Sequence, residues 1–276
     1  MMKLLKLTAL SVFTIAATAN TPVKEELPAS GAIQSNCTLP NTAFKAGEKV
    51  GFLVYYTAAN FINVSAGAGS FSTTLEKLNG KDVYHIKGEG YTLPSYEKFY
   101  KAKDTYESYV DVESMLPLKF VRNVQEGDYK KYQNVNFNRA ANTAISDAVF
   151  KISSCTHDVV SAVFWARNID FNRLKVGDRV RISIFLDNEN HDMYVRYLGK
   201  ETVKTKYGTF KTIKIKPTTI KGTIFTGDDK MTVWVTDDAN RVPIRIESPI
   251  IVGKVRIDMT SFDNLRNPMT ALVKKN

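Results

Sequence analysis

The sequence predicts an all-β protein, mainly antiparallel, with one short amphipathic helix. Short runs in which apolar and polar residues alternate recur along the chain, as from Met231 to Thr236, and such alternation is typical of strands with one buried face. Turn residues such as Asn79-Gly80 separate the runs. Strands and helices do not alternate regularly, so we expect an antiparallel curved sheet, a half-barrel or two stacked β halves.

Residues 1–19 have the pattern of a secretory signal peptide. Lys3 and Lys6 precede the apolar stretch 7–19, and Ala17-Thr18-Ala19 fits the small-residue rule for cleavage after Ala19. The stretch is shorter than the roughly 20 residues of a spanning helix, and the cleavage point lacks the Cys of a lipobox. We therefore expect a periplasmic or otherwise exported protein without a lipid anchor or a transmembrane segment.

Composition divides the rest of the chain into three parts. A polar, proline-containing, flexible lead-in is expected over residues 20–43, followed by a single β-rich domain over residues 44–264. A polar C-terminal tail with weak structure is expected over residues 265–276. With 43% hydrophobic and 24% charged residues, the chain has the composition of a globular protein that buries a sizeable core.

The alternating runs place the elements in order. Strands are expected at residues 47–56, 60–68, 71–78, 83–90, 96–110, 117–124, 129–138, 143–152, 178–186, 191–198, 201–205 and 209–216, with three more within 230–258. Gly67 and Gly69 indicate a bulge or a close approach of two backbones. Apolar residues recur with a helical period over 159–166, and Ser154 or Thr156 is the candidate N-cap of this helix.

The two cysteines are Cys37 in the lead-in and Cys155 just before the helix. An even number of cysteines in an exported chain favours a disulfide bond, which would tie the lead-in to the helix. Two free thiols are one alternative. A reactive thiol at Cys155 is another, because a helix N-terminus lowers the pKa of a thiol.

The formal net charge of +10 comes from scattered lysines rather than from an arginine-rich segment. No recognisable nucleic-acid-binding motif is present, so we expect no nucleic-acid partner and interpret the charge as a solvated basic surface. The sequence leaves the oligomeric state open.

Residues suited to catalysis or metal binding form no recognisable constellation. His85, His157 and His191 are far apart in the sequence, and none has a partner at metal-ligand spacing. There is no G-x-S-x-G or S-x-x-K motif and no phosphate-binding glycine loop. Asp228-Asp229 and Asp237-Asp238 are typical of turns. We expect no catalytic residue, no metal site and no cofactor, and a protein that is not an enzyme.

Aromatic residues are frequent in the first half of the chain. The tyrosines concerned are Tyr55, Tyr56, Tyr91, Tyr96, Tyr100, Tyr106 and Tyr109. They are consistent with a surface that binds carbohydrate or an apolar ligand, and equally with rings that pack around a β core.

Several segments together resemble a family of uncharacterised bacterial exported proteins. They are FKAGEKVGFLVYY, AGAGSF, SYVDVESMLPLKF, HDVVSAVFWARN, YGTFKTIKIKP and WVTDDANRVPIRI, followed by Gly253. In this order they resemble the domain of unknown function 3108, in versions seen in Bacteroidetes-like bacteria, over roughly residues 44–262. The family has no established activity, so the resemblance implies no functional residue. The β-rich character is also loosely similar to the half-barrel of periplasmic lipoprotein carriers, in which helices cover an apolar concave face.

We therefore expect a non-enzymatic envelope protein that binds an apolar or amphiphilic ligand, or a protein partner, in the concavity of the sheet. Lipid, glycan and envelope proteins are the partners considered. One alternative is a hydrolase whose site assembles from distant residues, which two adjacent histidines or a histidine beside a carboxylate in a cleft would favour. The other is an aromatic carbohydrate-binding module, which needs coplanar exposed rings, Trp234 among them.

Overall fold

The computed structural model describes residues 32–33, 37, 39–58, 62–218, 231–250 and 253–276. The expected signal peptide and its cleavage site lie outside these residues, as does most of the expected lead-in. Residues 31–276 form one compact unit, and the following description concerns that unit.

The described residues form a 17-stranded, mainly antiparallel sheet, which confirms the predicted fold class. The strands are β1 (Ala32–Ile33), β2 (Lys49–Ala58), β3 (Ile62–Leu78), β4 (Lys81–Thr92), β5 (Lys103–Asp111), β6 (Pro117–Glu126), β7 (Tyr129–Asn138), β8 (Thr143–Ile145), β9 (Val149–Lys151), β10 (Thr156–His157), β11 (Arg179–Leu186), β12 (Glu189–Lys204), β13 (Gly208–Pro217), β14 (Thr232–Thr236), β15 (Pro243–Pro249), β16 (Lys254–Asp263) and β17 (Leu272–Lys275). The helices are α1 (Val159–Ala166) and a short 3₁₀ turn, η1 (Phe171–Arg173). Among the described strands, only β1 and β10 pair in parallel, both with β11.

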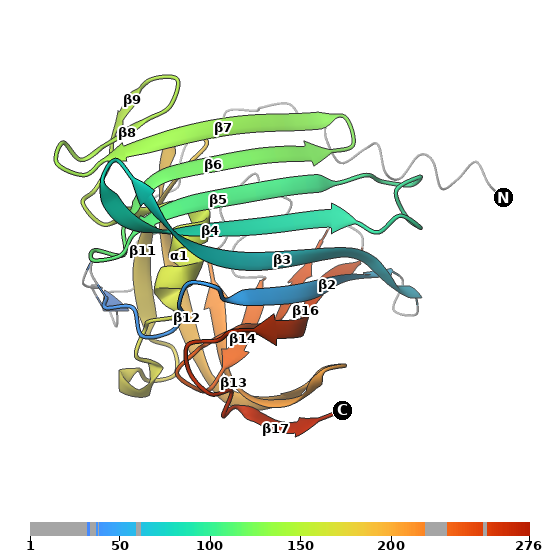
Figure 1. Cartoon of the computed structure of the whole chain (residues 1–276). Coiled ribbons are helices and arrows are strands. Elements are labelled where there is room, and N and C mark those ends of the chain that lie inside the picture. The colour runs from blue at the N-terminus through green and yellow to red at the C-terminus, as the bar shows by residue number, and fades with distance from the viewer. Residues whose placement is uncertain (1–31, 34–36, 38, 59–61, 219–230, 251–252) are drawn as a thin grey trace, which may run out of the picture. The chain divides into compact units, whose positions relative to one another are not determined.

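Figure 1 shows β2 to β7 side by side as one layer, with β11 to β14 crossing behind them. Because β2 pairs with β16, the two layers belong to one continuous sheet. α1 lies between the layers and contacts β4, β5 and β11. Phe44, Phe120, Trp165 and Phe185 are almost fully buried around it, and burying side chains of this size stabilises the fold by about 2–3 kcal/mol each.

The first residue of α1 is set by Asp158, which is fully buried. Its carboxylate accepts hydrogen bonds from the backbone N–H groups of Val160 (2.8 Å) and Ser161 (2.9 Å), and Ser161 Oγ accepts one from the Asp158 N–H (3.0 Å). The predicted N-caps Ser154 and Thr156 are therefore wrong. Thr156 and His157 pair with β11, and this pairing keeps the backbone extended up to Asp158.

Two long strands replace pairs of shorter predicted ones. β3 runs through Gly67 and Gly69, and β12 runs through Gly199. A Cβ on Gly67 would lie 2.8 Å from the Tyr91 carbonyl oxygen, which confirms the predicted close approach of backbones. Gly199 has a φ of 104° at a register shift against β13, a conformation that favours glycine. Glycines that resemble breaks in the sequence are bulges and close contacts inside continuous strands.

The C-terminal residues are ordered, and the expected weak structure of this segment is wrong. β17 pairs with β13, and Ala271 beside it is 1% exposed. Leu272 and Met269 pack on a second core cluster around Phe210. At the other end of the chain the lead-in is already packed near its boundary, since Ala43 is fully buried.

Candidate functional site

The three histidines lie in separate environments. His85 is on the face of β4 opposite to the buried Ile86, where its ring stacks on Tyr109 at 4.3 Å and its nitrogens hydrogen-bond Glu76 (2.8 Å) and Glu107 (2.7 Å). The hydrogen bond from His85 lowers the pKa of Glu76. This imidazole lies beside carboxylates, as the hydrolase alternative required, but at the surface of the strand rather than in a described cleft.

His157 and His191 both neighbour Ile184, one on each side of β11. Strands two apart are separated by about 10 Å, so β11 separates the two histidines. His157 Nδ1 is 3.3 Å from Ser161 Oγ, and His191 Nε2 bonds the Leu186 carbonyl oxygen at 3.2 Å. The described part of the chain holds no group of three or more His, Cys, Asp or Glu side chains placed to share a metal ion.

The predicted disulfide between Cys37 and Cys155 is present, with Cα atoms 4.8 Å apart. It ties the lead-in to the turn before β10, across a separation of 118 residues. In the chain-entropy model a loop of this length stabilises the fold by roughly 4–5 kcal/mol. A disulfide is consistent with a location outside the cytoplasm.

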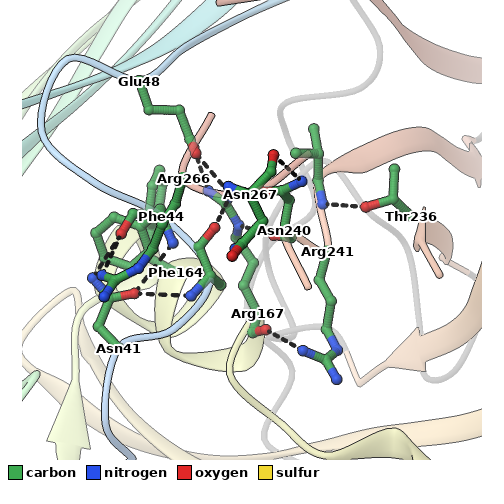
Figure 2. A network of polar contacts seen from close by, with 12 residues as sticks. Asn41, Phe44, Glu48, Phe164, Arg167, Thr236, Asn240, Arg241, Arg266 and Asn267 are labelled. Atoms are coloured by element: carbon green, nitrogen blue, oxygen red, sulfur yellow. Dashed lines mark hydrogen bonds and ion pairs between the residues drawn. The ribbon is translucent and has the colours of Figure 1, made fainter. Parts of the chain in front are cut away.

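Three of the segments that carry the family resemblance meet at a buried ion pair, shown in Figure 2. Arg167 at the end of α1 binds Glu48 through two hydrogen bonds of 2.5 and 3.1 Å, and the two side chains are 4% and 2% exposed. Arg167 Nε also donates to the Asn240 carbonyl oxygen at 3.0 Å. Its partners come from the start of β2 and from the turn before β15, so the guanidinium joins distant segments rather than facing a ligand.

Asn240 extends this network to the C-terminal segment. Its Nδ2 donates to the carbonyl oxygens of Asn267 (3.0 Å) and Pro268 (3.2 Å), and its Oδ1 accepts from the Asn267 N–H at 2.9 Å (Figure 2). Asp238 Oδ1 accepts from the Asn240 N–H at 3.0 Å, as expected of an Asp in this turn. The satisfied hydrogen bonds assign the network a structural role.

The space between the layers around α1 is filled by side chains of the core cluster. A hollow of about 350 Å³ lies beside the β3–β4 turn, and one of about 230 Å³ lies beside the disulfide. The first lies away from α1. The second is lined partly by Trp165 of α1 and Ile182 of β11, but Ser153, Ser154 and Ser183 also line it, so it is not the purely apolar concavity that was expected. Trp234, the ring expected at a carbohydrate surface, is 9% exposed and its indole N–H bonds Glu201.

Exposed aromatic rings gather instead where β4 meets β5 and β6 meets β7. We call this cluster the aromatic tip. Its members are Tyr91 (51% exposed), Phe99 (67%), Tyr100 (47%), Tyr129 (43%) and Tyr132 (67%). The ends of these strands lie together on the right of Figure 1. Exposed apolar side chains that gather in one region can mark a site of interaction with proteins, membranes or ligands.

Hydrogen bonds hold the two connections of the aromatic tip against each other. The Gly127 N–H donates to the Lys101 carbonyl oxygen at 2.8 Å, and Ala102 forms a β-bridge with Glu126. The Leu93 N–H donates to the Ala66 carbonyl oxygen at 2.9 Å, which ties the β4–β5 connection to β3. The backbone that carries the rings is therefore held by hydrogen bonds, so little conformational entropy is lost when the rings contact a partner.

Two carboxyl groups lie beneath the aromatic tip. Burial and the nearby charge of Asp104 raise the pKa of Glu126 to about 7, and burial also raises the pKa of Asp104. A protonated Glu126 donates a hydrogen bond to Asp104, which in turn accepts one from the Gln125 N–H at 3.0 Å. Burial, together with these two carboxylates, raises the pKa of Tyr100 to about 12.

The sequence indicated only part of the aromatic tip. Tyr91, Phe99 and Tyr100 lie within the tyrosine-rich stretch 55–109 of the sequence, whereas Tyr129 and Tyr132 lie outside it. Tyr55, from the same tyrosine-rich set, is 3% exposed and lies under the guanidinium of Arg256. Position within the element is the distinguishing signal, because the exposed rings lie in the β4–β5 connection or near the ends of β4 and β7, whereas Tyr55 lies in the middle of β2.

The fold is similar to that of a β-barrel-like protein of the domain of unknown function DUF1849 from Brucella abortus. The TM-score is 0.51 at 8% identity, covering 80% of this chain and 99% of that one. This likeness shows the fold alone.

Two further structures are less similar. An exported protein with a YmcC-like fold from Bacteroides fragilis has a TM-score of 0.33 at 10% identity, covering 80% of this chain and 98% of its own. The lipoprotein LppX of Mycobacterium tuberculosis has a TM-score of 0.25 at 13% identity, covering 81% of this chain and 88% of its own. At these TM-scores neither carries an argument about this chain.

None of the curated proteins compared matches the sequence. The family model described as "Protein of unknown function (DUF3108)" matches residues 52–260, most of the chain and nearly the whole segment in which the resemblance was expected. The chain belongs to this family.

Proposed function

We propose that the protein is an exported, non-enzymatic component of the cell envelope that binds an amphiphile through the aromatic tip. The observation that carries the proposal is the cluster of five exposed rings on a hydrogen-bonded base. Tyrosine suits a partner that is apolar at one end and wet at the other, and phenylalanine adds apolar contact area. The expected signal peptide and the disulfide support the exported location.

This proposal moves the binding site from the concavity of the sheet to the ends of β4 to β7. The interior around α1 is packed with buried rings, so a ligand there would have to displace part of the core. Among the residues that the structure describes, no helix has the length and apolar character of a membrane-spanning segment. Because the interior is packed, the amphiphile is proposed to bind at the surface of the protein.

The test is sedimentation of the purified mature protein with lipid vesicles that contain both neutral and anionic phospholipid. We expect the wild type to sediment with the vesicles and the double variant Phe99→Ser/Tyr132→Ser to stay largely in the supernatant. Val176→Ser/Val273→Ser is the matched control, because both valines are exposed (69% and 58%) and lie outside the aromatic tip.

Equal loss of binding in both double variants would contradict the proposal. So would a wild type that binds isolated cell-wall glycan but no vesicles, and this result would favour the carbohydrate-binding alternative. Circular dichroism of each variant checks that the fold is kept.

A further inference from the structure

We propose that the partner of the aromatic tip is the surface of an anionic lipid bilayer. This inference rests on the proposed function, because it names the amphiphile. The rings alone would fit any interfacial partner. The charges around them favour one whose head groups are negative.

Lysines surround the aromatic tip. Residues 93–103 and 127–131 contain five lysines and two acidic residues, a net charge of +3. Within the described residues, no carboxylate oxygen lies within 4.0 Å of the ammonium groups of Lys98, Lys103 or Lys130. The acidic residues are Glu97, which pairs with Lys101 at 3.8 Å, and Asp128. The three lysines are thus available to phosphate groups.

The position of these lysines on the strands matches that of the rings. Tyr91 is the cross-strand partner of Lys103, and Gln125 is that of Lys130. Lys98 Nζ lies 5.1 Å from the centre of the Phe99 ring. Rings and ammonium groups therefore lie at the same end of the layer, an arrangement typical of the interface between apolar chains and head groups.

The carboxyl pair beneath the tip adds little negative charge to it. Glu126 hydrogen-bonds Asp104, and burial disfavours the ionised form of both groups, so close to neutral pH they carry less than two negative charges. Tyr100 and Tyr106 lie near this pair, and Arg122 and Tyr129 lie near Tyr106. A neutral glycan could stack on the rings but would bring no negative charge to the three lysines, so it accounts for the rings and not for the charge around them.

The experiment compares vesicles of pure phosphatidylcholine with vesicles that contain one third phosphatidylglycerol. The variant Lys98→Gln/Lys103→Gln/Lys130→Gln should bind the anionic vesicles on the order of 100-fold more weakly than the wild type, since each lysine near an anionic surface contributes about a fivefold gain. The control Lys175→Gln/Lys211→Gln/Lys274→Gln removes the same charge from exposed lysines outside the tip and should bind like the wild type.

The outcomes separate the two proposals. Equal affinity of the wild type for neutral and anionic vesicles would overturn the anionic partner and leave amphiphile binding intact. An equal loss of affinity for anionic vesicles in both triple variants would also overturn it, because the net charge of the protein would then explain the binding without the lysines of the tip. Saturable binding of a short-chain phosphatidylglycerol below its micelle concentration, with the same lysine dependence, would replace the bilayer by a single-lipid site. Binding to neither vesicle would overturn both proposals.

Discussion

His157 shows how strongly one residue depends on where the fold places it. It is 2% exposed, and its ring centre lies 5.6 Å from that of Trp165. Burial, and then the nearby charge of Arg139, lowers its pKa to about 3. Position in the sequence indicated only that His157 stands before the helix. Its burial follows from the pairing of β10 with β11, which is a tertiary contact and leaves no mark in the local pattern.

The low pKa of His157 makes the protein less stable in acid. The unfolded histidine gains a proton below about pH 6.5, whereas the folded one stays neutral to about pH 3, so stability is lost as the pH falls between these values. We expect this residue to lower the free energy of unfolding by about 2 kcal/mol between pH 6.5 and pH 5.

Urea unfolding at pH 6.5 and pH 5 measures this loss. His157→Gln should not show this loss of stability between pH 6.5 and pH 5, whatever its stability at neutral pH. His191→Gln, at a half-buried position on β12, beyond β11, should keep the wild-type difference. If the stability of the two variants changed with pH in the same way, the buried imidazole of His157 would not be the source of the loss of stability in acid.

At the scale of elements, the alternating pattern predicted most strands because each has one buried face. The alternating pattern failed to predict the full length of a strand where the strand continued through a glycine at a bulge or a close contact. β3 and β12 were each expected as two strands, separated near Gly69 and near Gly199. Gly69 lies at a close contact of backbones and Gly199 at a bulge, and both strands continue through them. β17 was missed since its pairing with β13 joins segments more than 50 residues apart, which no local pattern records. The aromatic tip was found in part, because exposure is decided by the neighbouring turn.

The carboxyl pair at the ends of β5 and β6 makes a prediction at this scale. An unfolded glutamate ionises near pH 4.5, whereas Glu126 in the fold ionises at about pH 7, so stability falls as the pH rises between these values and the loss is complete above pH 7. Because the group is only partly buried, solvent screening reduces the effect, and we expect roughly 1 kcal/mol.

Glu126→Gln should therefore be more stable than the wild type at pH 8 and about equally stable at pH 4.5, as measured by urea unfolding. Glu97→Gln, which removes an exposed carboxylate from the same tip, is the control and should leave the wild-type pH dependence unchanged. A wild type whose stability did not fall relative to Glu126→Gln between pH 4.5 and pH 8 would contradict the raised pKa.

At the scale of the whole molecule, the chain is held by contacts between segments far apart in the sequence. The disulfide joins Cys37 to the turn before β10, and Glu48 at the start of β2 joins Arg167 at the end of α1. Asn240, which accepts a hydrogen bond from Arg167, donates one to Asn267 near the C-terminus. The sequence predicted the disulfide because cysteines have few other partners in an exported chain. It gave no signal for the Glu48–Arg167 pair, because charged residues usually remain at the surface.

The Glu48–Arg167 pair should be strongly coupled. Glu48→Gln leaves the guanidinium buried without its counter-charge, and Arg167→Met leaves the carboxylate in the same position. We expect each change to lower the free energy of unfolding by about 3–5 kcal/mol, and the double variant to lose clearly less than the sum, because it buries no unpaired charge.

Urea unfolding of the two single variants and the double variant gives the coupling energy directly. The exposed pair Lys77–Asp82, whose atoms are 2.8 Å apart, is the control, because its side chains are 72% and 58% exposed. The same cycle there should give a coupling below about 1 kcal/mol, since water screens both charges. Additive losses at Glu48 and Arg167 would mean that the two side chains act separately, and that the ends of the fold are joined by the packing around them rather than by the ion pair.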